Sequence, residues 1–483
     1  MNPSGKNVFL IHPTYRSRAD HTLVYRKGYG TAIPLGLAYI GARLIEGGHH
    51  VRIFDFQIEK GDVFKQIDDF QPDVFGISVT TPTANAAAGL VHQIKKRYPD
   101  RAIIAGGPHV SSLKREVFVE SSDYDFLVIG EGERTIIELM EALYGAMPIH
   151  EVKGICYREG KQVVDTPPRG FIKDLDTLPY LPIQLFDYRK YIPTPGTFIH
   201  LPNVAFLSSR GCPFHCVFCN KSMFGNTIRQ MSAKRMVDEI VEMKERFNVR
   251  EINFYDDTFT VNKHRIMEFC ELLSSRNAGV KWKCNSRVDT VTKEMLMAMK
   301  KAGCFSISFG VESGDERILK KIRKGITLEE ARDAFRWSKE AGITRAAFFM
   351  LNLPGDTRET IEKTIRFSRE IEPDFVSFEL TKPLPGTALA IREVLAGETN
   401  VQIKEELWRD WDSCTVSNKV FFLQNDLTEE YLEDAFARAV KRFYITSSYI
   451  IRSFGRLRSW AQLKSYVVAT VNIILSRLPK ETH

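Results

Sequence analysis

The chain has 483 residues, of which 43% are hydrophobic and 26% charged, an ordinary soluble composition with room for two or three domains. Three of its eight cysteines fall in one short segment, so they do not form the disulfide framework of a secreted protein. The first residues, Met1 to Lys6, have no apolar signal core, and we therefore expect a cytoplasmic protein.

The net charge of +7 is concentrated at the C-terminal end. Between Lys441 and His483, eight basic residues stand against the single acidic residue Glu481, and the other 440 residues are neutral overall. This distribution excludes a protein that is basic throughout, and no nucleic-acid partner is expected.

Residues 7–145 alternate short apolar runs with amphipathic stretches, which predicts a parallel sheet covered by helices. The predicted strands are Val8–His12, Val51–Phe56, Val74–Val79, Ala102–Ala105 and Phe126–Ile129. Helices are predicted over Leu35–Glu46 and Ala84–Lys96. Five strands with right-handed crossovers make a flavodoxin-like, doubly wound domain over residues 1–145, which binds ligands beyond the C-terminal ends of its strands.

Small, hydroxylated and glycine residues follow three of these strands. They are Ser78, Thr80 and Thr81 after the third strand, Gly106, Gly107 and His109 after the fourth, and Gly130, Glu131 and Gly132 after the fifth. Glycines let backbone approach a large flat ligand. One such loop fits ordinary turn chemistry, whereas three together favour a ligand site. The insertion from Tyr15 to Thr31 is long enough to cover that site.

Residues 146–200 are predicted to form a connector that includes a hairpin over Gly154–Val164. Beyond it, Cys212, Cys216 and Cys219 stand at a Cys-x3-Cys-x2-Cys spacing. Three thiolates this close can hold three corners of a cubic iron–sulfur cluster and leave the fourth iron without a protein ligand. The alternative is a zinc site, which needs a fourth Cys or His, and the only nearby candidate is His215.

Residues 201–390 resume the alternation of strands and helices with longer helices. Three of the predicted strands gather polar residues on one face, because side chains alternate along a strand. These sets are Asn253, Tyr255 and Asp257; Asn285, Arg287 and Asp289; and Ser306, Ser308, Gly310 and Glu312. Structural ion pairs could account for any one of these polar strand faces, but three of them together favour a cavity lined by polar side chains.

Residues 391–483 are predicted to be largely helical, with a basic amphipathic tail over 441–483. Its apolar positions are Ile450, Phe454, Leu457 and Ala461, with Arg452 and Arg456 roughly opposite. The apolar run from Tyr466 to Leu475 is too short to span a bilayer. Two interpretations stay open: a helix on an anionic membrane surface, or a helix packed on the preceding domain.

The cysteine segment, preceded by apolar Val204 to Phe206 and with Phe218 before its last cysteine, resembles the cluster loop of the radical S-adenosylmethionine superfamily. The glycine-rich strand ends, with Pro34 to Leu37 opening the first helix, resemble the cobalamin-binding domain fused to many of these enzymes. The resemblance implies an α/β protein with a flavodoxin-like cobalamin domain, a partial (β/α)6 barrel and a helical C-terminal extension.

The same resemblance implies three cofactors: a 4Fe-4S cluster on the three cysteines, S-adenosylmethionine and cobalamin. Asp256 and Asp257 should meet the amino group of methionine, Arg287 its carboxylate or the ribose, and Glu312 the ribose, with Ser308 on the same polar face. The glycine-rich loops would hold cobalamin. The Asp-x-His-x-x-Gly signature for its lower axial ligand is absent, so we expect something other than a histidine of that motif at the lower face. His109 is a candidate, but a lone histidine in a Gly-Gly-Pro-His turn is more often structural than a ligand.

The resemblance further implies an enzyme that receives an electron from a flavodoxin or ferredoxin, forms a 5′-deoxyadenosyl radical and methylates an unactivated carbon of a small-molecule or lipid substrate. An alternative is a cyclase, oxidoreductase or carbon–carbon coupling enzyme acting on a lipid, isoprenoid or tetrapyrrole. A tRNA-modifying enzyme is a more distant alternative, since residues 1–145 contain no cysteine for a second cluster. A binding protein with a decayed site is disfavoured, because the cluster loop, Arg287 and Glu312 are all present.

Overall fold

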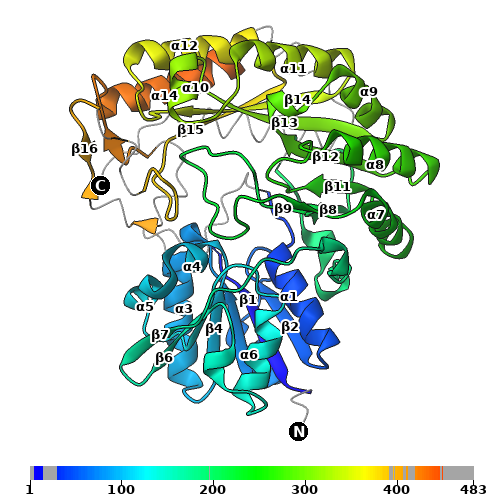
Figure 1. The fold of residues 1–483 in the computed structure, drawn as a ribbon, viewed down its shortest axis with the longest axis vertical. Helices are drawn as coiled ribbons and strands as arrows, with labels where there is room; N and C mark the ends of the chain where they lie inside the picture. The colour runs from blue at the N-terminus through cyan, green and yellow to red at the C-terminus, as the bar shows by residue number, and fades with distance from the viewer. Residues whose placement is uncertain are drawn as a thin grey trace.

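A computed structural model describes residues 5–14, 30–446 and 449, apart from 195, 391–394, 396–397, 406–409 and 412–418. Two α/β domains make up most of this part of the chain. Figure 1 shows the N-terminal domain in blue and cyan beneath the second domain, whose strands and helices run from green to yellow. The α/β fold class predicted from the sequence is confirmed.

The N-terminal sheet has the strand order β2-β1-β3-β4-β5-β6-β7. Its strands are β1 (Asn7–His12), β2 (His50–Asp55), β3 (Val74–Ser78), β4 (Ala102–Gly106), β5 (Phe126–Val128), β6 (Ile155–Glu159) and β7 (Gln162–Asp165). The first five are parallel and lie close to their predicted bounds. The predicted hairpin, β6 and β7, pairs antiparallel with β5, so the sheet continues past residue 145 into the segment expected to be a connector.

Helices cover both faces of this sheet, as in a doubly wound fold. They are α1 (Leu35–Glu46), α2 (Val63–Phe70), α3 (Ala84–Arg97), α4 (Pro108–Leu113), α5 (Val117–Glu120) and α6 (Thr135–Leu143). Successive residues of β1 point to opposite faces: Leu10 packs in one core with Leu37 of α1, and Phe9 packs in the other with Val91 of α3. The chain order reverses between β1 and β3, and this switch point is where doubly wound sheets bind ligands.

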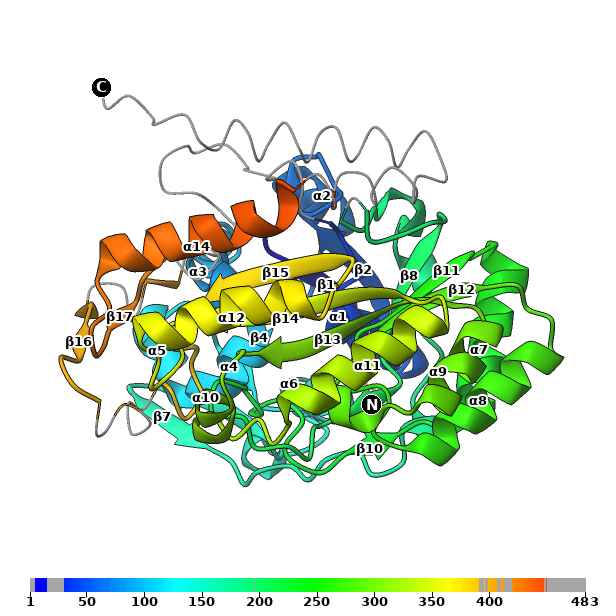
Figure 2. The same cartoon turned by 90° about the horizontal axis from the view of Figure 1, so that it is seen from above.

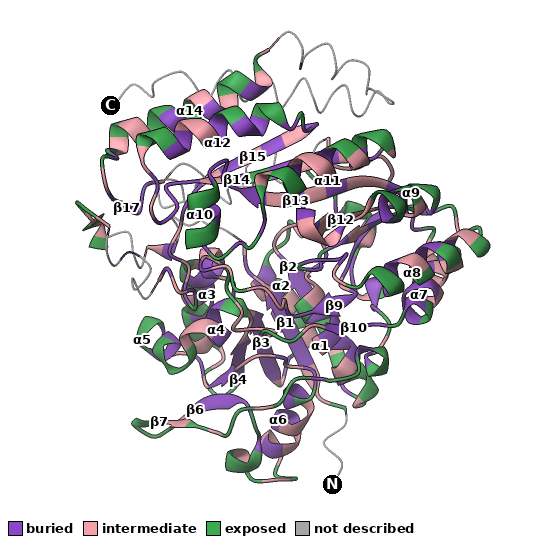
Figure 3. Ribbon diagram, turned by 45° about the horizontal axis from the view of Figure 1, so that its top comes forward, coloured by how far each residue is buried: buried purple, intermediate pink, exposed green. Residues whose placement is uncertain are grey.

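The second domain is a partial barrel of six parallel strands in the order β15-β14-β13-β12-β11-β8. The strands are β8 (Asn203–Phe206), β11 (Glu251–Phe254), β12 (Lys281–Ser286), β13 (Cys304–Glu312), β14 (Thr344–Leu351) and β15 (Phe375–Leu380). Helices line the outside of the curved sheet (Figure 1), namely α7 (Ala233–Phe247), α8 (Lys263–Ser275), α9 (Lys293–Lys301), α10 (Glu316–Lys321), α11 (Leu328–Glu340) and α12 (Arg358–Glu370). Figure 3 shows strands mostly buried and outward helix faces exposed.

The C-terminal region adds the short strands β16 (Gln402–Ile403) and β17 (Phe422–Leu423) and the helix α14 (Glu429–Tyr444), which lies beside α12 and β15 (Figure 2). The Tyr444 hydroxyl donates to the Val376 carbonyl of β15 at 2.6 Å. The predicted amphipathic segment from Ile450 onward lies outside the described residues. Among those the structure does describe, we find no helix with the length and apolar character that crossing a bilayer requires.

Candidate functional site

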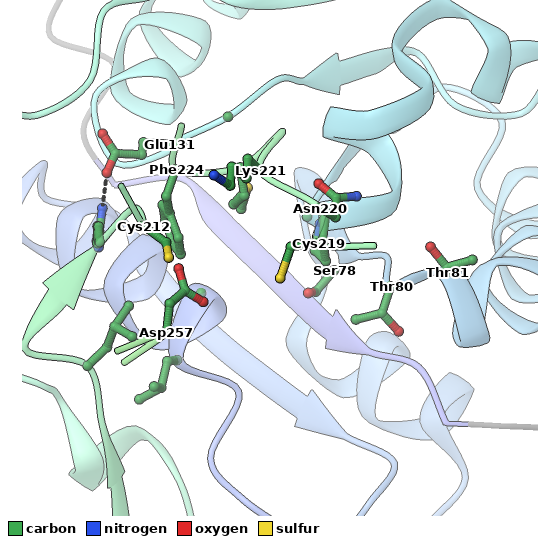
Figure 4. A pocket seen from close by; sticks show the side chains of 18 of the residues that line it. Ser78, Thr80, Thr81, Glu131, Cys212, Cys219, Asn220, Lys221, Phe224 and Asp257 are labelled. Atoms are coloured by element: carbon green, nitrogen blue, oxygen red, sulfur yellow. Dashed lines mark hydrogen bonds and ion pairs between the residues drawn. The ribbon is translucent and has the colours of Figure 1, made fainter. Parts of the chain in front are cut away.

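A cavity of about 870 Å³ lies where the two domains face each other. From the N-terminal domain it is lined by Ser78, Thr80, Thr81, Gly106, Gly107, Gly130, Glu131 and Gly132, and from the barrel by Cys212, Cys216, Cys219, Asp257, Arg287, Ser308 and Glu312. Figure 4 shows Cys212 and Cys219 between the Glu131 side of the cavity and the Thr80 and Thr81 side. Residues predicted separately on two domains thus share one space.

An apolar branch of the cavity runs below the strand ends of the N-terminal domain. It lies between the sheet and the helices α1 and α6, and its lining includes Leu10, Gly76, Ile104, Val128, Leu37, Ile40 and Ile136. Such a slot suits a flat aromatic group, because it offers apolar surface on both sides and few polar partners.

The cluster loop is held in shape by backbone contacts on both of its flanks. The strand β9 (Ser209–Arg210) pairs antiparallel with β10 (Arg229–Gln230), and the Cys212 amide donates to the Gly225 carbonyl at 3.4 Å. Gly211 has a φ of +83°, and a Cβ there would lie 2.4 Å from the Thr227 carbonyl oxygen. Only glycine fits this turn, since any other side chain adds backbone strain and a clash.

Replacing Gly211 with alanine should therefore distort the loop and lower the iron and sulfide bound per chain severalfold. The strain alone costs about 1 kcal/mol or more. Gly89, inside α3, is a matched control, because a Cβ there meets no atom within 4 Å. Gly89→Ala should bind as much iron as the unaltered protein, and equal iron in both variants would contradict the role of Gly211.

Among the described ranges, no three His, Cys, Asp or Glu side chains are arranged to hold a single metal ion, and the three loop thiols stand at a Cys-x3-Cys-x2-Cys spacing. A cubane suits this spacing, because each thiolate binds a different iron. Burial raises the pKa of Cys216, and burial followed by the negative charge of Cys216 raises the pKa of Cys219 to about 12. A bound metal cluster would stabilise the thiolate form of these cysteines.

Glu312 and Lys324 form a buried ion pair on the barrel wall, with Lys324 Nζ 2.8 Å from Glu312 Oε1. Glu312 follows a register shift in β13 and has a φ of +72°, a strained conformation typical of ligand sites. A Cβ on Gly310 would lie 2.5 Å from Glu312 Oε1 and 2.9 Å from Lys324 Nζ, so this glycine makes room for the pair. The alternation of side chains predicted Glu312 but not its partner.

Arg287 lies next to the cluster loop. Its guanidinium stacks 3.7 Å from the Phe214 ring centroid, and its Nη1 is 3.9 Å from the sulfur of Cys216. Two of its nitrogens donate to the carboxylate of Asp289 at 2.9 and 2.8 Å, and Nη2 also donates to the Lys324 carbonyl. Because Asp289 occupies the bidentate edge, the predicted contact with a bound carboxylate would have to use Nη1.

Asp256 does not line the cavity, contrary to the sequence prediction. It is fully buried, and its carboxylate accepts hydrogen bonds from the Ser208 amide (2.7 Å), the Ser208 hydroxyl (2.6 Å) and the Ser209 hydroxyl (2.7 Å). Adjacent residues point in opposite directions, so only Asp257 reaches the cavity. Burial and the charge of Asp256 raise the pKa of Asp257, while Lys221 opposes them.

His109 is also directed away from the cavity. Its Nε2 lies 2.8 Å from Glu120 Oε2, its Nδ1 lies 3.3 Å from Thr81 Oγ1, and its ring meets the Trp411 ring edge to face at 5.3 Å. The reason is local: α4 begins at Pro108 and turns the imidazole toward the opposite face of the sheet. The candidate axial ligand from the sequence is therefore a buried structural residue.

The cavity lining also includes residues that were not predicted from the sequence as part of the site. Among them are His12, Arg210, Lys221 and Lys324. His12 Nδ1 and Lys221 Nζ are shielded from solvent and have no hydrogen-bond partner among the described residues. Unpaired buried polar atoms at a cavity wall indicate a missing ligand. The position of His12 at a strand end was the one signal in the sequence that could have found it.

Three other cysteines lie close together behind the barrel sheet. Cys284 interacts with Cys304, and Cys270 is near both, within the apolar core. Burial raises the pKa of Cys270 and of Cys284. They are small buried residues of the apolar core.

Comparison with known proteins decides the family. The family model of the radical SAM superfamily matches residues 206–368, and that of the B12 binding domain matches residues 22–140. An uncharacterized methyltransferase of Pyrococcus horikoshii is 33% identical over 427 residues, covering 87% of this chain and 90% of the relative. The chain belongs to the radical SAM superfamily. The resemblance stated from the sequence is confirmed.

This radical SAM chain is also 29% identical over 394 residues to an anaerobic magnesium-protoporphyrin IX monomethyl ester cyclase of Cereibacter sphaeroides, covering 79% of the chain and 63% of the relative. Among solved structures, the radical S-adenosylmethionine methyltransferase TsrM of Kitasatospora setae, with cobalamin and a [4Fe-4S] cluster bound, matches with a TM-score of 0.71 at 14% identity. The match covers 97% of this chain and 99% of that one, and it shows the shared two-domain fold.

The cofactors follow from the two domains: a 4Fe-4S cluster and S-adenosylmethionine for the radical SAM domain, and cobalamin for the B12-binding domain. The cavity fits them. It offers three thiols on one wall, a polar barrel face beside them, and glycine-rich strand ends above an apolar slot on the other wall. The unpaired Nδ1 of His12 and Nζ of Lys221 leave polar atoms for ligands to satisfy.

Proposed function

We propose that this chain methylates an unactivated carbon atom of a small-molecule or lipid substrate. The observation that carries the proposal is the cavity shared by the cluster-loop cysteines and the strand ends of the B12-binding domain. When bound, the reduced cluster would convert S-adenosylmethionine to a 5′-deoxyadenosyl radical, and cobalamin would supply the methyl group. Both groups must act on one carbon atom, so the reaction requires one space that both domains line.

The lining residues divide into three roles. Cys212, Cys216 and Cys219 would hold the cluster; Asp257, Arg287, Ser308 and Glu312 would bind S-adenosylmethionine; and Ser78, Thr80, Thr81, Gly106, Gly107, Gly130 and Gly132 would bind the rim of cobalamin. A carboxylate such as Glu312 suits a ribose because it can accept hydrogen bonds from both hydroxyls. The electron would come from a reduced flavodoxin or ferredoxin.

The alternative is a radical cyclase, oxidoreductase or coupling enzyme. It stays open because one relative of this chain is named as a cyclase. Anaerobic turnover with methyl-labelled S-adenosylmethionine and an extract of a strain lacking this gene separates the two. Methyl transfer should place the label in a new compound, together with S-adenosylhomocysteine and 5′-deoxyadenosine. Formation of 5′-deoxyadenosine with no labelled product would favour the alternative.

The positive charge of the C-terminal tail bears on whether the substrate is a lipid. Residues 450–483 carry six of the basic side chains against the single acid Glu481, and we propose that they bind an anionic membrane surface. The full chain should sediment with phosphatidylglycerol vesicles at low salt and not with phosphatidylcholine vesicles. A chain lacking residues 450–483 should stay in the supernatant, and its sedimentation to the same extent as the full chain would overturn this proposal.

A further inference from the structure

His12 is the last residue of β1, at the point where the order of the N-terminal sheet reverses. Its neighbours in the sheet are Asp55 of β2 and the end of β3, whose last residue is Ser78. Side chains at this edge lie over the crevice where a doubly wound sheet binds its ligand. His12 shares the face of β1 that carries Leu10, and both residues line the cavity.

The imidazole of His12 has an unsatisfied nitrogen. Its Nδ1 is closed off from solvent and receives no hydrogen bond from the part of the chain that the structure describes. Of the residues lining the cavity, all of them described, His12 is the only histidine. A buried ring nitrogen without a partner is costly in the absence of a ligand, so its place at the cavity wall indicates that a ligand supplies the partner.

The neighbour of His12 across the sheet is Asp55, which carries a carboxylate. Asp55 is itself held in place, since it accepts hydrogen bonds from the Tyr191 hydroxyl at 2.6 Å and from the Gln57 amide at 2.8 Å. A carboxylate held near a histidine can set the orientation of its ring for metal binding.

His109 shows what a structural histidine looks like in the same domain. Both of its ring nitrogens have partners, and Trp411 covers its ring. Coordination of a metal by His109 would require breaking the contact with Glu120 or with Thr81. His12 has no such contact at Nδ1, and it faces the cavity that His109 avoids.

We propose that His12 is the lower axial ligand of the cobalt in bound cobalamin. The inference rests on cobalamin binding at the strand ends of the N-terminal domain. The apolar slot beneath these strand ends would accommodate the dimethylbenzimidazole base of the cofactor, which would leave the lower axial position to a protein nitrogen. His12 would thereby hold the corrin against the sheet and tune the reduction potential of the cobalt, as an axial ligand tunes that of haem iron.

Electron paramagnetic resonance of the full chain loaded with cob(II)alamin tests this proposal. An axial nitrogen splits the high-field cobalt lines into triplets. Protein grown with histidine labelled with nitrogen-15 should show doublets instead, because that isotope has nuclear spin one-half, whereas a dimethylbenzimidazole ligand from unlabelled cofactor would keep the triplets. Triplets in the labelled protein, or cobalt lines without nitrogen splitting, would overturn the assignment.

The variant His12→Ala should retain the cobalt signal and lose the nitrogen splitting, while the matched variant His109→Ala should keep it. Splitting that survives in His12→Ala would assign the ligand elsewhere and overturn the proposal. The absence of any bound cobalt signal in the unaltered protein would instead remove the cobalamin assignment itself, so the two failures are distinguishable. The isotope experiment needs no variant, and it decides the question even if His12→Ala does not fold.

Discussion

Cys216→Ala should abolish the cleavage of S-adenosylmethionine, lowering the rate by at least about 1,000-fold, or about 4 kcal/mol. The cluster has three protein ligands, so the loss of one leaves two irons without a thiolate. Cys216 is the middle ligand of the three, and Arg287 Nη1 lies 3.9 Å from its sulfur. The measurement is anaerobic formation of 5′-deoxyadenosine from reconstituted protein, alongside iron and sulfide content.

Cys156→Ala is the matched control, because it removes a buried thiol that lies in the hairpin strand β6 and bonds to Asp165. This variant should bind one cluster per chain and cleave S-adenosylmethionine at the normal rate. A Cys216→Ala protein that keeps its cluster absorbance and its cleavage activity would refute the assignment of the loop as the cluster site.

Much of the fold could be predicted because its signals are local. Each parallel strand of the N-terminal domain is an apolar run between turn residues, and the predicted bounds of β1 to β5 differ little from those observed. The pairing of the hairpin β6 and β7 with β5 could not be predicted, because the partner of an edge strand is set by tertiary contact. Part of the segment that was expected to be a connector therefore belongs to the N-terminal sheet.

The site was predictable where one strand or one loop carries it, and unpredictable where partners come from different elements. The cysteine spacing and the polar faces of β12 and β13 are local patterns. Lys324 reaches Glu312 only because α10 returns the chain to the barrel wall. His109 was a candidate because it follows a strand, but the direction of its ring depends on a helix start and on Trp411, which is far away in the sequence.

The buried ion pairs between the two domains could not be predicted from the sequence. Glu131, expected to contact a cofactor, accepts hydrogen bonds from Arg210 Nη1 at 2.9 Å and from Arg229 Nη1 at 2.7 Å, and also from the Ile172 amide. Arg210 donates further to Glu133 at 2.5 Å, and all four charged side chains are buried. These partners lie 79 and 98 residues from Glu131 in the sequence, so no local pattern connects them.

This buried network joins the loop after β5 to both strands that flank the cluster loop, β9 and β10. Glu131→Ala should therefore lower the free energy of unfolding by about 3–5 kcal/mol, because removing one member of a buried ion pair leaves uncompensated charge. It should also reduce methylated product more than 5′-deoxyadenosine, because the radical still forms while the B12-binding domain is no longer held in register with the cluster.

Denaturant unfolding and the ratio of methylated product to 5′-deoxyadenosine measure the two effects. Glu46→Ala is the matched control: its pair with Arg43 lies on the exposed side of α1, where such pairs contribute about 0–1 kcal/mol. Glu131→Gln keeps an acceptor for one arginine and should fall between Glu131→Ala and the unaltered chain in both measurements. If Glu131→Ala unfolds like Glu46→Ala and keeps the product ratio, the two domains are held together by their apolar contacts and the network sets neither stability nor register.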